Sequence, residues 1–340
     1  MILHQNTALF EDAVRFTAEQ MNIPPAFIEK DYWVTYALFT IFNHEIGKDT
    51  VFKGGTALSK CYNLIERFSE DIDLVILRRD GESDSKLKSK LKTVSAVIEE
   101  VLPEEEITDI THKMGMNRKT AHQYKKSFEG DYGQIRDVII LESTWLGYYE
   151  PYTTQRVISF VGKMMQQNGQ TKIAEENGLS PFDVLVLEPI RTICEKIMSL
   201  VRFSYSENPV EDLKKKIRHT YDLHKLLQQK EFADFLNSRD FDEMLLKVAN
   251  DDVASFRNNN QWLVHHPNAS LFFRDLEKIW PELKTTYTGD FKNLVYGDLP
   301  EETVVFDTLK MIKERLNTIS WSIEIETEHR ISNTEHRISK

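Results

Sequence analysis

The chain is poor in cysteine and has no long apolar run. Its 340 residues include only Cys61 and Cys194, which argues against a disulfide framework and against a cysteine-rich zinc site. No segment holds about eighteen consecutive apolar residues, and the first residues lack the basic start and apolar centre of a signal peptide. We therefore expect a cytoplasmic protein in which both thiols are reduced and buried.

The chain also lacks a net positive charge. A formal net charge of -11 disfavours indiscriminate binding to nucleic acids, because such binding relies mainly on cations that contact phosphates. Two segments nevertheless concentrate positive charge: residues 113–126 hold five cations and no acid, and a second cluster lies at 214–218. These segments are the predicted places for an RNA backbone.

A glycine pair is the first sign of a functional site. Gly54 and Gly55 follow a short apolar run, and Thr56 begins a segment whose apolar residues recur at helical spacing. A strand-to-helix turn without side chains lets the backbone approach a phosphate at the helix N-terminus. The glycine-rich P-loop pattern is absent, so the alternative for this pair is a tight turn that binds no ligand.

Two aspartates follow about fifteen residues later. Asp71 and Asp73 stand in a predicted strand, whose period of two places both carboxylates on one face. Paired carboxylates on a rigid strand suit Mg²⁺. Glu142, at the end of another predicted strand, is the leading candidate for a third carboxylate, and Asp137 is the second. The glycine pair and the aspartates together have the layout of a nucleotidyl-transfer site.

Polar side chains around the glycine pair are candidates for nucleotide binding. Lys53 precedes the pair directly, and Lys60 lies one turn along the predicted helix. Arg67 and Ser69, just before the aspartates, can contact phosphate and cap the turn, respectively. Arg67 and Lys60 also have a plainer interpretation as solvated surface cations.

A second group of charged residues lies in the C-terminal half. Lys196 sits beside the apolar stripe of a predicted helix over 189–205; its alternative role is a lysine whose stem covers the core. In the helix predicted over 211–228, Arg218 and Asp222 are four residues apart on one face. They either form a helix salt bridge, or Asp222 orients a lysine or an acceptor hydroxyl while Arg218 meets phosphate.

The periodicity predicts an α+β fold with two unlike halves. The first half is a nucleotidyltransferase core over 51–165 with a mixed sheet, preceded by helices over 1–50. Its later strands are predicted at 122–129, 135–143 and 156–161. Residues 166–178 are the predicted linker, and 179–325 form a helical domain that begins with a helix at 181–187. The tail, 326–340, is predicted to be disordered.

Four segments of the chain coincide with one family. They are IEKDYWVTYAL at 28–38, FKGGTALSK with RFSEDIDL, the EKI helix around Lys196, and RHTYDL at 218–223. With these motifs, spread over roughly residues 25–230, the chain resembles the AbiEii/AbiGii toxin family of nucleotidyltransferase-like proteins. Members of that family are the toxic halves of bacterial type IV toxin–antitoxin and phage-abortive-infection systems.

The resemblance implies a polymerase β-like nucleotidyltransferase core and a helical C-terminal domain. It also implies a nucleoside triphosphate with Mg²⁺, or Mn²⁺ as an alternative, and transfer of a nucleotide to the 3′ end of tRNA, which inhibits translation. Gly54, Gly55 and Thr56 would hold phosphate, and the two aspartates would bind metal. Lys196 and Asp222 would be an essential charged pair. An antitoxin partner need not contact the chain directly.

Three points stay open at this level. Asp222 in place of Glu142 could act as the general base for the attacking hydroxyl, because the sequence does not measure the distance to the proton. The acceptor could be a protein or small-molecule hydroxyl instead of RNA. A nucleotide-binding regulator without turnover is the alternative from a different functional class.

Overall fold

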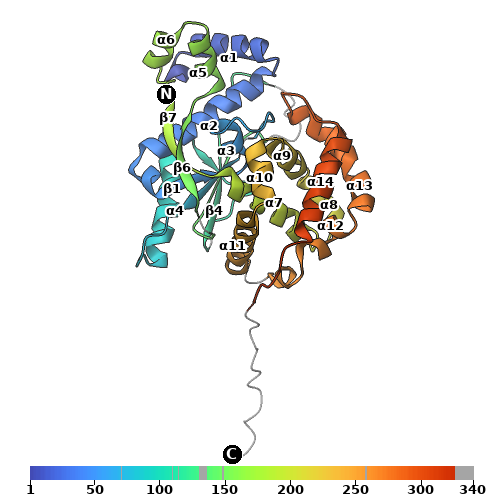
Figure 1. Ribbon diagram of the computed structural model, residues 1–340. Coiled ribbons are helices and arrows are strands. Elements are labelled where there is room, and N and C mark those ends of the chain that lie inside the picture. The colour runs from blue at the N-terminus through green and yellow to red at the C-terminus, as the bar shows by residue number, and fades with distance from the viewer. Residues whose placement is uncertain are drawn as a thin grey trace, which may run out of the picture.

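The computed structural model describes residues 1–69, 71–108, 110–113, 115–129, 136–147, 149–256 and 259–325. It has a mixed sheet with flanking helices in the first half and only helices in the last part of the chain (Figure 1). The expected α+β class is therefore confirmed. The predicted disordered tail, 326–340, lies outside the described residues. No helix in the described ranges is long and apolar enough to span a membrane.

One mixed sheet of seven strands forms the centre of the first half, in the order β3-β4-β5-β2-β1-β7-β6. The pairs β2–β5 and β1–β7 are parallel, and the other pairs are antiparallel. The strands are β1 (Thr50–Lys53), β2 (Ile72–Ile76), β3 (Glu104–Glu105), β4 (Asn117–His122), β5 (Ile139–Thr144), β6 (Tyr152–Val157) and β7 (Phe182–Leu187).

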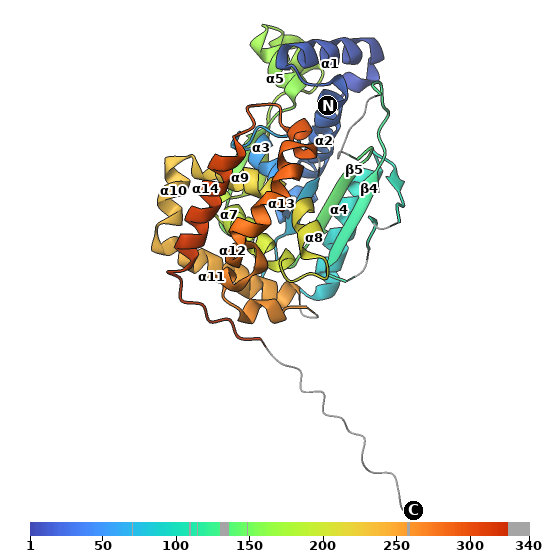
Figure 2. The same ribbon diagram turned by 90° about the vertical axis from the view of Figure 1, so that its right-hand side faces the viewer.

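Among the helices of the first half, α2 and α4 pack against this sheet, and α1 and α2 lie beside α5 at one end of the molecule (Figures 1 and 2). The first two helices are broken before Pro25: Asn22 ends α1 in the left-handed region, and Pro25 begins α2. The helices are α1 (Thr7–Met21), α2 (Pro25–Asn43), α3 (Gly54–Lys60), α4 (Asp84–Glu99), α5 (Phe160–Gln167) and α6 (Thr171–Glu176).

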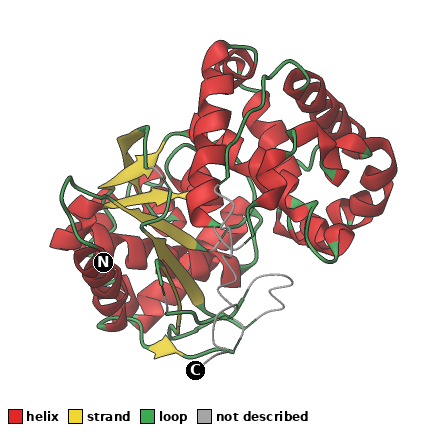
Figure 3. Ribbon diagram, turned by 90° about the horizontal axis from the view of Figure 1, so that it is seen from below, coloured by secondary structure: helices red, strands yellow, loops and turns green. Residues whose placement is uncertain are grey.

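The helices after the sheet gather on one side of it (Figure 3). Among them α7 packs against α9 and α11, and α9 packs against α14. They are α7 (Pro189–Phe203), α8 (Pro209–Lys215), α9 (Arg218–Leu227), α10 (Lys230–Leu236), α11 (Arg239–Ser255), α12 (Leu271–Arg274), α13 (Leu276–Thr288) and α14 (Glu302–Leu316).

The prediction of a helix at 181–187 is wrong, because residues 182–187 form β7, which lies between β1 and β6 in the sheet. The segment between Pro181 and Pro189 is too short for its periodicity to distinguish strand from helix, and its buried Val184 and Val186 favour a strand. The sheet therefore continues past the linker predicted at 166–178, which contains α6. The helical part begins at Pro189, ten residues after the predicted boundary at 179.

Two other predicted strands are displaced. The run predicted at 122–129 forms a strand earlier, as β4, and the run at 156–161 is split between the end of β6 and the start of α5. Ser159 caps α5, because its side chain accepts a hydrogen bond from the backbone N–H of Gly162. The prediction missed this helix start because the apolar residues around it fit either period.

The sheet has one face in the main hydrophobic core. Phe52, Leu74 and Leu141 share that core with buried residues of α2 and α4. The side chains between them along each strand point to the opposite face, which carries two small apolar clusters, one around Val51 and Val75 and one around Ala121 and Ile140. This second face is available for polar side chains.

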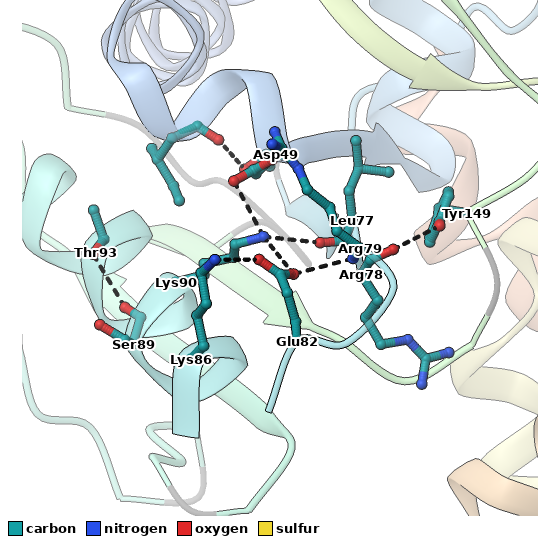
Figure 4. A network of polar contacts seen from close by, with 12 residues as sticks. Asp49, Leu77, Arg78, Arg79, Glu82, Lys86, Ser89, Lys90, Thr93 and Tyr149 are labelled. Atoms are coloured by element: carbon teal, nitrogen blue, oxygen red, sulfur yellow. Dashed lines mark hydrogen bonds and ion pairs between the residues drawn. The ribbon is translucent and has the colours of Figure 1, made fainter. Parts of the chain in front are cut away.

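A polar network holds the end of β2 that is farthest from the aspartates (Figure 4). Lys90 of α4 is buried, and its Nζ donates to the backbone oxygen of Leu77 at 3.2 Å. The same Nζ lies 2.8 Å from Glu82 Oε2 and 3.1 Å from Asp49 Oδ2. The network ties α4 to the strand that carries Asp73.

Candidate active site

Four charged residues form a row across the face of the sheet opposite the main core. In the strand register Lys53 of β1 pairs with Asp73 of β2. Asp73 pairs with Glu142 of β5, and Glu142 pairs with Lys119 of β4. Paired positions point to the same face, so the side chains are neighbours in the order positive, negative, negative, positive.

The central carboxylates of this row repel each other. Burial and the charges of Glu142 and Asp71 raise the pKa of Asp73 to about 7, although Lys53 and Lys119 lower it. Nζ of Lys119 lies 3.0 Å from Oε2 of Glu142. An additional cation beside Asp73 would therefore be favourable.

The glycine pair brings the start of α3 close to this row. Gly54 has a φ of 82°, and a Cβ atom there would collide with Oδ2 of Asp73. A Cβ atom on Gly55 would lie 2.5 Å from Nη2 of Arg67 and 3.2 Å from Oγ of Ser69. Both positions exclude larger residues because charged and polar side chains pack against the bare backbone.

Asp71 lies directly before β2. Its Oδ1 atom is buried and accepts no hydrogen bond from the described part of the chain, although Nη1 of Arg136 lies 3.5 Å away. The hydroxyl of Thr56 donates to the backbone oxygen of Asp71 at 2.6 Å, which holds the residue in place. Asp71 thus keeps an acceptor oxygen for which the protein supplies only a distant ion pair.

These carboxylates have the donor chemistry of a Mg²⁺ site. Oxygen ligands, the raised pKa of Asp73 and the unsatisfied oxygen of Asp71 all favour a hard cation. Across the described ranges, no group of three or more His, Cys, Asp or Glu side chains is close enough to hold a metal ion. Mg²⁺ is commonly bound by one or two carboxylates together with substrate phosphates, and the residues fit that arrangement.

A cavity of about 420 Å³ lies between this row and the helices α7, α9 and α11. This volume is in the range of small-ligand sites. The sheet side of the wall includes Lys53, Gly54, Gly55, Asp73 and Glu142, and the helical side includes Arg191, Glu195, Lys196, Arg202, His219, Asp252 and Phe256. The site is therefore completed by the helical part of the chain.

Asp222 is fully buried and joins α9 to two other parts of the chain. Its carboxylate accepts hydrogen bonds from Nε and Nη2 of Arg67, at 2.6 and 2.7 Å. Nζ of Lys196 lies 2.7 Å from Oδ2. Burial alone would raise the pKa of Asp222, but Arg67 and Lys196 hold it well below its usual range.

This arrangement decides between two interpretations of Asp222. The carboxylate orients Lys196, which lines the cavity, whereas Asp222 itself does not line it. Its salt bridges run to Arg67 and Lys196, which favours the interpretation that Asp222 orients a lysine over the alternative of a helix salt bridge. Arg218 is half-buried at the first residue of α9 and lies outside the cavity wall.

Two predicted phosphate contacts lie elsewhere. Arg67 is 2% exposed and bound to Asp222, so it neither lines the cavity nor belongs to the solvated surface. Lys60 is also buried, and its Nζ donates to Asp31 Oδ1 at 2.5 Å and to Thr35 Oγ1 at 2.7 Å. Both cations connect elements, and their partners are distant along the chain.

Thr56 and Ser69 stabilise the turn between α3 and β2. Their hydroxyl oxygens lie 3.0 Å apart, and Thr56 is buried outside the cavity wall. For the third carboxylate, Glu142 stands beside Asp73, whereas Asp137 lies before β5. Asp137 is 58% exposed in its side chain and forms an ion pair with Lys126.

Sequence reasoning does not single out several cavity residues on the helices. Glu195 of α7 lies 3.2 Å from Nζ of Lys53, and it also pairs with Arg191. Glu195 and Arg202 are seven residues apart, so helical spacing from the EKI motif could have found both. His219 directly follows Arg218, and burial together with Lys196 and Lys216 holds its pKa well below the usual range. No sequence signal marks Asp252.

A comparison with family models completes the assignment. A search of curated proteins gives no significant match. The model of the family described as "Nucleotidyl transferase AbiEii toxin, Type IV TA system" matches residues 36–310, which include the glycine pair, the charged row and every residue of the cavity wall. The chain therefore belongs to the AbiEii family of nucleotidyl transferase toxins of type IV toxin–antitoxin systems.

Proposed function

We propose that the protein transfers a nucleoside monophosphate from a nucleoside triphosphate to an RNA end in a Mg²⁺-dependent reaction, with the 3′ end of tRNA as the first candidate acceptor. Modified tRNA would not be aminoacylated, so translation would stop. The observation that carries the proposal is the Asp73–Glu142 pair on the floor of a cavity whose opposite wall presents Lys196.

The residues of the site have separate roles in this proposal. Asp71 and Asp73 would hold Mg²⁺, which when bound would neutralise charge on the triphosphate. The backbone of Gly54 and Gly55 approaches the phosphates, and Lys196 stabilises the charge that develops during transfer. The acceptor oxygen forms a bond to the α-phosphorus, the bond to the pyrophosphate oxygen breaks, and pyrophosphate leaves.

Glu142 is the residue we propose as the base for the acceptor hydroxyl. It lines the cavity and stands beside Asp73. Asp222, the alternative base, is fully buried, and both its oxygens already accept from cations. A carboxylate held in that way has a low proton affinity and is out of reach of a substrate in the cavity.

Ion pairs reduce the exposed positive charge of the segment 113–126, which the sequence predicts as an RNA-binding surface. Lys113, Lys119 and Lys126 each form an ion pair with an acidic residue from another segment. Such pairs reduce the charge that an RNA backbone would meet. In the second cluster Lys214 and Lys215 are paired with Glu211 and Asp212. RNA is proposed from the family resemblance and from the open cavity, and not from a broad basic surface.

The test is transfer of label from each of the four nucleoside triphosphates, in the presence of Mg²⁺ and total tRNA. Wild-type protein should label RNA, and the Asp73→Asn variant should not. The exposed variant Asp137→Asn is the matched control and should label RNA at the wild-type rate. Label that enters protein or a small-molecule fraction, and not RNA, would replace the RNA acceptor with one of those classes.

A further inference from the structure

Two cations of the helical part share one aromatic ring, and one of them, Arg202, lines the cavity. Arg202 of α7 has its Cζ atom 4.9 Å from the centre of the Phe203 ring. Nζ of Lys216, directly after α8, lies 4.6 Å from the same ring centre. Arg202 also lies over Phe256, at 4.1 Å. Contacts with aromatic faces fix the position of a cation without neutralising its charge.

Neither cation forms an ion pair with an acidic residue within the described ranges, in contrast to the neighbouring Lys214 and Lys215. Burial and the charges of Arg202 and Arg218 together lower the pKa of Lys216 to about 8. The two cations are therefore held at the same ring although their charges repel each other. An anion bound between them would relieve that repulsion.

The carboxylates near Arg202 do not cancel its charge. The charges of Asp252 and Glu142 act on Arg202, but neither residue forms an ion pair with it. Burial raises the pKa of Asp252 to about 7, so that group is only partly ionised at neutral pH. Glu142 is already paired with Lys119.

Arg202 and Lys216 lie near the carboxylates that we propose for catalysis. Arg202 lines the same cavity as Asp73 and Glu142, but it lies on the helical wall. Lys216 shares the Phe203 ring with Arg202 but does not line the cavity, and the charges of Asp73 and Lys119 act on it. A ligand between the walls would meet Asp73 and Glu142 on the sheet side and Arg202 on the helical side. A phosphate chain that carries a metal ion has this combination of charges.

We propose that Arg202 and Lys216 form a phosphate-binding subsite that holds a phosphate group of the substrate away from the carboxylate row. The planar guanidinium of Arg202 can donate two parallel hydrogen bonds to one phosphate, and Lys216 adds a point charge. The phosphate belongs either to the triphosphate of the nucleotide or to the backbone of the RNA acceptor. This subsite deepens the proposed function and rests on it for the identity of the substrate.

The experiment uses the full chain and two probes. Binding of inorganic tripolyphosphate with Mg²⁺ is measured by calorimetry, and binding of total tRNA is measured by filter retention at several salt concentrations. The variants are Arg202→Gln, Arg202→Lys, Lys216→Gln and the control Lys215→Gln. Lys215 is the neighbouring residue, is 73% exposed in its side chain and is paired with Asp212.

Each glutamine variant loses one charged contact, so its affinity for the affected probe should fall by about tenfold or more. The control should bind both probes as the wild type does. Arg202→Lys should recover part of the loss. If tripolyphosphate is the affected probe, the subsite serves the nucleotide. If tRNA binding is affected, the subsite serves the acceptor. The slope of the logarithm of the tRNA binding constant against the logarithm of salt concentration should then also decrease in magnitude by about 0.7 for each lost contact.

Three results would overturn the subsite. The first is wild-type binding of both probes by both glutamine variants, and the second is binding of neither probe by the wild type. The third is a loss in Arg202→Gln that Arg202→Lys does not recover while Lys216→Gln binds normally, since that pattern indicates a packing role. If the probes bind through these residues but the wild type transfers no label, the proposed transfer fails and the subsite stands.

Discussion

Asp73 and Glu142 stand directly beside each other on the parallel strands β2 and β5. Two carboxylates in such positions destabilise a sheet unless something compensates them. Lys53 and Lys119 flank the pair, yet the pKa of Asp73 remains raised to about 7. The sheet therefore keeps an electrostatically costly arrangement at the floor of the cavity, which is typical of a functional site.

We expect Glu142→Gln to change both the rate of transfer and its pH dependence. Removal of a proposed base should lower the rate by about 100-fold or more. Removal of the neighbouring charge should also lower the pKa of Asp73, since Glu142 is its largest charge contribution. Calorimetry of Mg²⁺ binding as a function of pH should then show a midpoint at lower pH. An unchanged midpoint would contradict the coupling, and Asp137→Asn should leave both quantities unchanged.

In the metal-free protein, the contribution of Asp73 to the free energy of unfolding should fall as the pH rises from about 4 to about 7. Because the pKa of Asp73 is raised from 3.8 to about 7, the folded state keeps a proton that the unfolded chain has lost. Mg²⁺ favours the ionised carboxylate, so it should raise the melting temperature more at about pH 8 than at about pH 6. Scanning calorimetry with and without Mg²⁺ measures this difference, which should disappear in Asp73→Asn.

Asp222→Asn should lower the free energy of unfolding more than a substitution in the neighbouring surface pair of Lys225 and Glu66 does. The change leaves Arg67 and Lys196 buried without a carboxylate, which should cost about 3–5 kcal/mol in the free energy of unfolding. The control is Lys225→Ala, because Lys225 pairs with Glu66 between the same two parts of the chain. That exposed pair should contribute about 1 kcal/mol or less. Urea unfolding measures both, and similar losses would contradict the role of burial.

Gly54→Ala should inactivate the protein, whereas Gly81→Ala should not. Both glycines have a positive φ, 82° and 78°, so both variants should lose about 1 kcal/mol of stability through backbone strain. Only at Gly54 would the new methyl group also collide with Asp73, because nothing lies within 4 Å of the Cβ position at Gly81. Transfer assays and melting curves separate the two effects. Full activity in Gly54→Ala would show that Asp73 moves aside without consequence.

The Lys90 network should stabilise the fold in a pH-dependent way. Burial alone would raise the pKa of Glu82, but the ion pair with Lys90 and other hydrogen bonds lower it to about 2. A depressed carboxyl pKa stabilises the fold above about pH 4.5, and this contribution is lost as the pH falls towards 2. Lys90→Met should therefore be less stable than wild type at neutral pH.

The difference between wild type and Lys90→Met should shrink between about pH 4.5 and pH 2, as measured by chemical unfolding across that range. Lys86→Met removes the more exposed partner of Glu82, 63% exposed in its side chain, and should have a much smaller effect at every pH. A difference that does not change with pH would mean that Lys90 acts by packing alone.

Residues close together in the sequence determined the floor of the site. Gly54 and Gly55 mark a strand-to-helix turn through their missing side chains, and strand periodicity sets the face to which Asp73 of β2 points, with Asp71 directly before the strand. Glu142 could be predicted because it follows a run of apolar residues within one strand. These inferences depend on backbone geometry over a few residues, which local sequence controls.

Tertiary structure alone decided how the charged residues are paired. The sequence showed Arg67, Lys60 and Asp222 as charges, but it did not show that Arg67 meets Asp222 across 155 residues or that Lys60 meets Asp31 across 29. It also did not show that residues 182–187 complete the sheet beside β1. Such pairings depend on which elements pack together, and burial then changes a solvated ion into a positioned partner.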